Sequence, residues 1–226
     1  MHEVAIGDDI RERLIARRGR FHIYDRFEPA RSAFVIIDMQ NAFCKPGAPA
    51  EVAASRDIVD DINAFNDVLR GHEVEIIWIV TAFDSTNGRS DWENLTGRIT
   101  AAEVRERTMA YMAPGAEGTL LWEPLKRLDT EMIVIKNRYG CFSAGASPLE
   151  RILRSRGIDT VFFGGTKTNI CCETAARAAF DMDFNVVLVD DCCAALSDRE
   201  HLAAMENVIQ QFGDVMGWRE VAERLG

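Results

Sequence analysis

The sequence is short of histidine and of basic residues, and it has no long apolar stretch. Its 26 lysines and arginines stand against 36 aspartates and glutamates, so the net charge of the 226-residue chain is -10. This balance argues against nucleic acid or an anionic membrane as a partner. No apolar run approaches the roughly 20 residues that a membrane-spanning helix needs, and residues 1–9 lack the basic-then-apolar pattern of a secretory signal. We therefore expect a cytoplasmic protein.

The cysteines and histidines are not spaced as metal ligands. The four histidines are scattered along the chain, at His2, His22, His72 and His201. No Cys-x-x-Cys motif occurs among the six cysteines, and four of them form the adjacent pairs Cys171–Cys172 and Cys192–Cys193, which rarely bridge. A zinc site needs closely spaced Cys or His pairs. We predict reduced thiols, no metal and no cofactor.

Continuous apolar runs alternate with helical patterns along most of the chain. Strands are predicted at Ala33–Ile37, Val74–Ala82, Met132–Ile135, Val161–Phe163 and Asn185–Val189, with a short sixth at Asp214–Met216. Helical spacing or capping residues predict helices over about 57–70, 102–111, 149–155 and 197–212, and from 218 onward. Unbroken apolar strands are typical of a parallel sheet covered on both faces. The fold class expected is therefore α/β, a Rossmann-like three-layer α/β/α architecture with a mostly parallel sheet of about six strands.

The first 30 residues are more polar than the rest. Ile10 and Leu14 suggest a short helix, and residues 21–24 read as an extended arm laid over the body or over a neighbouring subunit. No internal repeat or linker divides the remainder. We expect an N-terminal helix and arm over residues 1–30 and a single domain over residues 31–226.

A cysteine follows one of the buried strands. Gly164 and Gly165 are expected to end that strand, because glycine serves where the backbone bends or approaches something closely. Thr168 and Asn169 are good N-cap residues for a helix from about residue 170. Cys171 then lies in the first helical turn, where free N–H groups and the helix dipole favour the thiolate.

The position of this cysteine has a second interpretation. Cys171 and Cys172 can both simply fill a contact between helix and sheet, because free cysteine behaves as a small buried hydrophobe. Position alone leaves both interpretations open.

Two other strands end with a charged side chain at the same edge of the sheet. Asp38 follows the first strand and Lys136 the third. Each has an ordinary explanation, since a terminal aspartate often caps a turn and a lysine often points to water. Ligands of open parallel sheets bind beyond the carboxyl ends of the strands. Together with Cys171 these residues form a coherent set of nucleophile, base and cation.

Three segments carry a family resemblance: Val35–Asn41, Lys136 with Arg138 and Tyr139, and Thr168–Cys171. Their order and spacing resemble the isochorismatase-like cysteine hydrolase superfamily over roughly residues 30–215. The resemblance implies that Asp38, Lys136 and Cys171 form a catalytic triad. An ammonium in this position is expected to lower the pKa of both the carboxyl and the thiol.

The resemblance also implies roles around the nucleophile. A cis peptide bond is expected between Thr166 and Lys167, where the family usually has an apolar pair. Backbone N–H groups of Lys167 and Cys171 would bind a developing oxyanion. Cys172 stands where the family has an apolar residue and is interpreted as packing.

Two branches of this family can be separated by sequence. True isochorismatases cleave a vinyl ether without a cysteine, so Cys171 favours C–N cleavage instead. Metal-dependent nicotinamidases carry an Asp-x-His motif and a further histidine after the second strand. The corresponding stretch here, Thr81–Asn87, has no histidine. A metal-free enzyme is expected.

The motifs look most like those of amidohydrolases that act on ureides and carbamoyl compounds, such as ureidoacrylate, biuret, triuret or N-carbamoylsarcosine. Substrate contacts are expected from Gln40, Asn41, Phe43, Arg138, Tyr139 and Asn169. The alternatives are an amidase of another small primary amide, of the maleamate type, and a non-catalytic binding protein. The partners expected are a small-molecule substrate and further copies of the chain in a dimer or tetramer.

Overall fold

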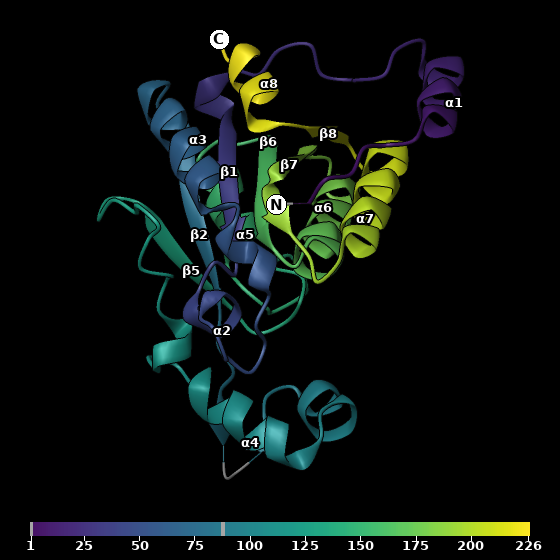
Figure 1. Cartoon of the computed structure of the whole chain (residues 1–226). Coiled ribbons are helices and arrows are strands. Elements are labelled where there is room, and N and C mark those ends of the chain that lie inside the picture. The colour runs from purple at the N-terminus through teal and green to yellow at the C-terminus, as the bar shows by residue number, and fades with distance from the viewer. Residues whose placement is uncertain (1, 87–88) are drawn as a thin grey trace.

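The computed structural model describes residues 2–86 and 89–226, so Asn87, the last residue of the histidine-free stretch, lies outside it. A six-stranded sheet runs through the centre in the order β5-β2-β1-β6-β7-β8 (Figure 1). Its strands are β1 Ser32–Ile37, β2 Glu75–Thr81, β5 Met132–Lys136, β6 Thr160–Thr166, β7 Asn185–Ala194 and β8 Asp214–Met216. Every pairing within it is parallel, which confirms the predicted sheet.

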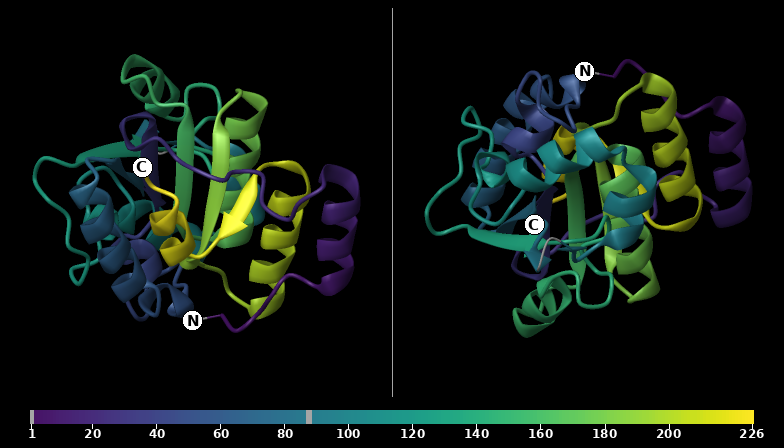
Figure 2. Two further views of the ribbon diagram at one scale, coloured as in Figure 1. Left: turned by 90° about the horizontal axis from the view of Figure 1, so that it is seen from above. Right: turned by 90° about the horizontal axis from the view of Figure 1, so that it is seen from below.

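Helices cover both faces of the sheet. Helices α5 (Leu149–Ser155), α6 (Glu173–Asp181) and α7 (Asp198–Gln211) bury apolar side chains against one face. Helices α3 (Val59–Gly71) and α8 (Trp218–Glu223) do so on the other (Figure 2). Neighbouring residues of a strand point to opposite faces, so β1 places Val35 in the first core and Phe34 in the second. The three-layer architecture is confirmed. None of the helices in the described ranges is long and apolar enough to cross a membrane.

The N-terminal segment packs on the body of the same chain. Helix α1 (Asp8–Arg18) lies beside α7 (Figures 1 and 2) and buries Ile10 and Leu14. The arm that follows is tied down through Asp214, whose Oδ2 accepts a hydrogen bond from the Ile23 N–H at 2.7 Å. Of the two expected resting places for the arm, the structure shows the one over its own body.

A long connection between β2 and β5 lies beyond the carboxyl ends of the strands (Figure 1). It contains the short hairpin β3 (Ser85–Thr86) and β4 (Arg89–Ser90), the π-helical turn η3 (Asn94–Ile99), helix α4 (Ala102–Tyr111) and the 3-10 turn η4 (Glu117–Thr119). Smaller turns elsewhere are η1 (Pro29–Arg31), α2 (Asn41–Cys44) and η2 (Ala53–Arg56). The connection therefore covers the edge where the candidate side chains were predicted, and the helix at 102–111 is confirmed.

The glycines of β6 do not end the strand, and that prediction was wrong. The strand runs through Gly164 and Gly165 to Thr166. Gly165 has φ +106°, and a Cβ there would lie 2.0 Å from the carbonyl oxygen of Ile37 on β1. The glycine is needed for this close approach and for its positive φ rather than for a stop. It lets β6 run close beside the end of β1, where the candidate site begins.

Candidate active site

The ends of β1 and β5 and the turn after β6 bring Asp38, Lys136 and Cys171 together. The Lys136 Nζ atom lies 2.8 Å from Asp38 Oδ2 and 3.7 Å from Cys171 Sγ. All three residues are buried, with exposed fractions of 0%, 1% and 4%. The parallel register explains the convergence, because β2 and β5 pair Thr81 with Lys136 while Asp38 follows the last residue of neighbouring β1.

A fourth polar residue, Thr81, completes this cluster. Its hydroxyl donates to Asp38 Oδ1 at 2.7 Å and accepts from Lys136 Nζ at 2.6 Å. Both carboxylate oxygens of Asp38 therefore have a partner. The sequence-based prediction missed Thr81. The available signal was a polar residue after the apolar run of residues 76–80, at the edge where Asp38 and Lys136 were expected.

The backbone at Asp38 adopts the left-handed conformation, with φ +57°. Such a residue costs roughly 1–2 kcal/mol, and aspartate is among the few that adopt it. The following residues are fixed by Gln40, whose amide Nε2 donates to the carbonyl oxygens of Thr81 and Gly118 at 2.9 and 2.8 Å. Its Oε1 accepts from the Thr81 N–H at 2.7 Å. Gln40 thus links the segment after β1 to β2 and to η4 in the connection between β2 and β5.

The electrostatics differ from the expected low-pKa thiolate. Burial raises the pKa of the Cys171 thiol well above its ordinary value, and the nearby Lys136 ammonium offsets only part of this. The negative charge of the neighbouring Asp38 raises the pKa of the thiol further. Burial also opposes the charge on Lys136, but the Asp38 carboxylate 2.8 Å away gives the largest contribution in its favour, and the pKa of Lys136 is raised. The resting site therefore holds a neutral thiol beside an ammonium–carboxylate pair.

The turn that carries Cys171 is not capped as predicted. It is a π-helical turn, η5 (Thr168–Cys172), which runs into α6, and no side chain caps it. The N-cap prediction was wrong because the Thr168 hydroxyl is hydrogen-bonded to His201 Nδ1 at 2.9 Å instead. The peptide bond between Thr166 and Lys167 is cis. Cys172 is fully buried and its Sγ lies 3.7 Å from the Gly164 carbonyl oxygen, on the core side of the turn.

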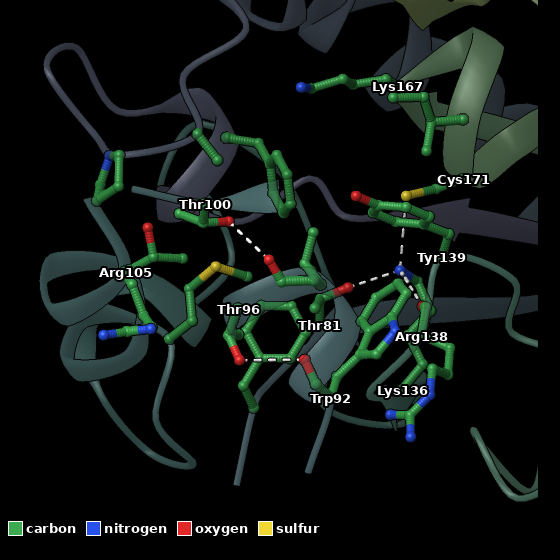
Figure 3. Close-up of a pocket in the computed structure, with 18 of the residues that line it drawn as sticks. Thr81, Trp92, Thr96, Thr100, Arg105, Lys136, Arg138, Tyr139, Lys167 and Cys171 are labelled. Carbon is green, nitrogen blue, oxygen red and sulfur yellow. Dashed lines mark hydrogen bonds between the residues drawn. The ribbon is translucent and has the colours of Figure 1, made fainter. Parts of the chain in front are cut away.

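A cavity of about 250 Å³ opens above Cys171 (Figure 3). Among the residues expected to contact substrate, it is lined by Phe43, Arg138 and Tyr139, and also by Lys136 and Lys167. The connection between β2 and β5 supplies most of the remaining lining: Phe83, Trp92, Leu95, Thr96, Thr100, Val104, Arg105, Thr108 and Met112. The sequence predicted that this connection covers a site, but α4 has no apolar stripe that would have shown which side chains face it.

Three of the expected substrate contacts lie outside this lining. Gln40 is occupied by backbone groups, as described above, and the Asn41 amide donates to the Glu117 carbonyl oxygen at 3.0 Å. Asn169 does not line the cavity either, and its Oδ1 is buried without a hydrogen-bond partner within the described residues. The neighbouring Ile170 faces the cavity in its place.

One wall of the cavity is an aromatic cluster held by Asp91. The rings of Trp92 and Tyr139 meet edge to face, 4.6 Å apart, and the Arg138 guanidinium lies 5.2 Å from the Trp92 ring. Asp91 accepts hydrogen bonds from Asn137 through its carboxylate at 2.6 Å and from Arg138 through its carbonyl oxygen at 2.9 Å. These bonds fix the connection against the end of β5 and hold the two rings beside the thiol.

Within the described ranges, no three His, Cys, Asp or Glu side chains are grouped so that they could hold a metal ion. The polar groups at the floor of the cavity are instead a thiol, a carboxylate, an ammonium and a hydroxyl. These groups can supply a nucleophile, accept and return its proton, and hold both in place.

Fold and site together define an enzyme of the α/β class with a thiol, a carboxylate and an ammonium at the carboxyl edge of a parallel sheet. The chain belongs to the isochorismatase family, since residues 32–220 match the isochorismatase domain. The resemblance inferred from the three motifs is thereby confirmed.

Known relatives place the chain within this family more closely. It is 30% identical over 199 residues to ureidoacrylate amidohydrolase RutB of Klebsiella pneumoniae subsp. pneumoniae, covering 83% of this chain and 84% of the relative. A cysteine hydrolase from Pseudomonas syringae pv. phaseolicola has a similar structure, with a TM-score of 0.79, 25% identity and coverage of 90% and 96%. The pyrazinamidase of Pyrococcus horikoshii, solved with zinc, shares the fold at a TM-score of 0.70 and 18% identity, with coverage of 83% and 99%.

Proposed function

We propose that the protein is a cysteine-dependent amidohydrolase that cleaves a C–N bond of a small ureide or carbamoyl compound. The observation that carries this proposal is the buried contact of Lys136 with both Asp38 and Cys171 beneath the cavity. The 30% identity to ureidoacrylate amidohydrolase RutB supports the ureide as substrate class.

The proposed reaction begins with transfer of the thiol proton of Cys171 to Asp38. The sulfur then attacks the carbonyl carbon, and the negative charge on the carbonyl oxygen is bound by the backbone N–H groups of Lys167 and Cys171. The loss of one such donor typically costs about 3–4 kcal/mol of transition-state stabilisation. The C–N bond breaks as Asp38 returns its proton to the leaving nitrogen, which departs as ammonia or an amine. Water activated by Asp38 then hydrolyses the acyl group from sulfur.

The neutral resting thiol fits this sequence of steps. Because burial raises the pKa of Cys171, the thiolate forms only as Asp38 accepts the proton. The Lys136 ammonium lies 2.8 Å from Asp38 Oδ2 and 3.7 Å from Cys171 Sγ, so it holds the base in place and stabilises the thiolate once formed. The Thr81 hydroxyl donates to Oδ1 of Asp38 while Lys136 contacts Oδ2. The carboxylate is therefore already fixed in its orientation when proton transfer begins.

A panel of compounds with ammonia release as the readout tests this proposal. Ureidoacrylate, 3-ureidopropionate, biuret and N-carbamoylsarcosine represent ureides, and maleamate and a simple aliphatic amide represent other primary amides. The proposal expects turnover of at least one ureide and its loss in Cys171→Ala. Turnover of maleamate alone would favour the amidase alternative, and no turnover of any compound would contradict C–N hydrolysis.

A further inference from the structure

The cavity is basic although the protein is acidic. The residues that line it include Arg105, Lys136, Arg138 and Lys167, and neither Asp nor Glu is among them. The chain as a whole carries a net charge of -10. A cleft lined by one sign of charge raises the local concentration of ligands of the opposite sign.

Two of these four charges are neutralised by groups of the protein. Lys136 pairs with Asp38, and Arg138 lies 3.9 Å from the Asp91 carboxylate while donating to two backbone carbonyl oxygens. The charges of the Arg105 and Lys167 side chains are not neutralised in this way. Across residues 2–86 and 89–226, neither finds an acceptor or an acidic partner. Both therefore face the cavity without an ion pair within the described residues, but Arg105 also borders a second cavity together with Glu93 and Glu106.

Lys167 is the uncompensated charge beside the nucleophile. It is half-buried and follows the cis peptide bond, four residues before Cys171, and both side chains line the cavity. Figure 3 shows Lys167 beside Cys171, with its ammonium end extended over the cavity, whereas Arg105 lies on the opposite side. Because both side chains line this one cavity, a single bound molecule can contact the Lys167 ammonium and the Cys171 sulfur.

We propose that the substrate carries a carboxylate, and that Lys167 binds this carboxylate while Cys171 attacks the carbamoyl carbon. This inference rests on the proposed hydrolysis of ureides and narrows it to acidic ones. The cavity of about 250 Å³ is below the range of about 300–1,000 Å³ for pockets that hold drug-sized ligands. It suits a compound of few atoms, and its apolar and aromatic walls leave the basic residues as the groups that bind an anion.

A matched pair of substrates tests the inference. 3-Ureidopropionate and its methyl ester share the ureide and differ in charge. For wild type, kcat/KM for ammonia release should be higher for the acid. Lys167→Met keeps most of the stem and removes the charge. It should lower the ratio of kcat/KM for the acid to kcat/KM for the ester by about 10- to 100-fold, the range of one charged hydrogen bond, whatever the change common to both substrates. The exposed Lys126, outside the cavity lining, provides the control Lys126→Met, which should change neither value.

A pair of alkylating reagents gives a readout that does not need turnover. Iodoacetate and iodoacetamide are similar in size and differ in charge, and Cys171 is the cysteine in the cavity lining. The rate of alkylation of Cys171 by iodoacetate, divided by its rate with iodoacetamide, is followed by mass spectrometry. This ratio should be several-fold higher in wild type and in Lys126→Met than in Lys167→Met. A change in the pKa of the thiol affects both reagents and leaves the ratio unaltered.

The outcomes separate the two proposals. If ureides are hydrolysed but Lys167→Met changes neither the preference for the acid nor the alkylation ratio, the carboxylate site is wrong and the proposed function stands. If no ureide is hydrolysed while the alkylation ratio still depends on Lys167, the proposed function is wrong and the anion site stands.

Discussion

Lys136 Nζ lies 2.8 Å from Asp38 Oδ2, and both side chains are almost completely buried. Removing one partner of a buried ion pair leaves the other charge without compensation and is strongly destabilising. The same lysine contacts Cys171 Sγ and the Thr81 hydroxyl. This one ion pair therefore couples the stability of the fold to the reactivity of the proposed nucleophile.

Lys136→Met should destabilise the protein by about 3–5 kcal/mol, because Asp38 is left buried and unpaired. The free energy of unfolding from urea denaturation measures this. The double variant Lys136→Met with Asp38→Asn is the matched control and should recover part of the loss. If Lys136→Met were as stable as wild type, the ion pair between Lys136 and Asp38 would not contribute to stability.

The titration of Cys171 provides a second prediction. Because burial raises the pKa of this thiol, its alkylation by iodoacetamide should still accelerate as the pH rises past 9. At pH 7, Lys136→Met should react more slowly than wild type, since the variant lacks the ammonium that stabilises the thiolate. A rate that already reaches its plateau below pH 7 would contradict the neutral resting thiol.

The two adjacent cysteines should respond differently to substitution. Cys171→Ala should abolish turnover and leave stability nearly unchanged, because the side chain is small and its proposed role is chemical. Cys172→Ala should retain most of the activity and lose about 1 kcal/mol of stability, since its buried sulfur packs against β6. Mass spectrometry after reaction with a chloroacetamide probe identifies the modified residue, and an adduct on Cys172 would overturn this assignment.

Chelators should leave turnover unchanged. Residues 81–87 contain no histidine, and the described ranges hold no group of three His, Cys, Asp or Glu side chains able to bind a metal. The test is ammonia release after dialysis against EDTA, compared with an untreated sample. Activity that is lost in EDTA and restored by zinc or iron would show that a metal takes part.

The sequence predicted the parts of the site that follow from strand order. Asp38 and Lys136 each end a continuous apolar strand, so the parallel sheet had to bring them to one edge. The sequence did not predict which side chains face the cavity. Gln40 has the same polarity as a substrate contact, and only the position of Gly118 far along the chain shows that its amide is already occupied. The net pKa of Cys171 likewise depends on burial, which the local pattern of a helix start does not reveal.

The segment Val161–Thr168, which comprises most of β6 and the start of η5, shows the same limit. A pair of glycines after an apolar run fits both a strand end and a close approach of two backbones, and the choice depends on where Ile37 lies. Thr168 fits both an N-cap and a partner for a distant side chain, and the choice depends on His201, 33 residues away. In such cases the local sequence is compatible with both structures, and a contact with a residue distant in the sequence determines which one forms.

His201 makes stability depend on pH in a direction that can be measured. Burial, together with the imidazole of His2 stacked on it at 4.4 Å, lowers the pKa of His201 to about 4, from an ordinary value of 6.5. Below pH 6.5 the unfolded chain binds a proton that the folded protein does not, so the folded state loses stability as the pH falls from 6.5 toward 4. For wild type this contribution amounts to about 2 kcal/mol between pH 7 and pH 5.

Asp191 acts in the opposite direction over the same range, because burial raises the pKa of its carboxyl to about 7. The prediction is therefore a difference between variants. His201→Gln keeps a hydrogen-bonding group beside Thr168 and cannot titrate, so its free energy of unfolding should fall by about 2 kcal/mol less than that of wild type between pH 7 and pH 5. The exposed His72 supplies the control His72→Gln, which should follow wild type at both pH values. Parallel pH profiles for wild type and His201→Gln would show that His201 is not held neutral in the folded protein.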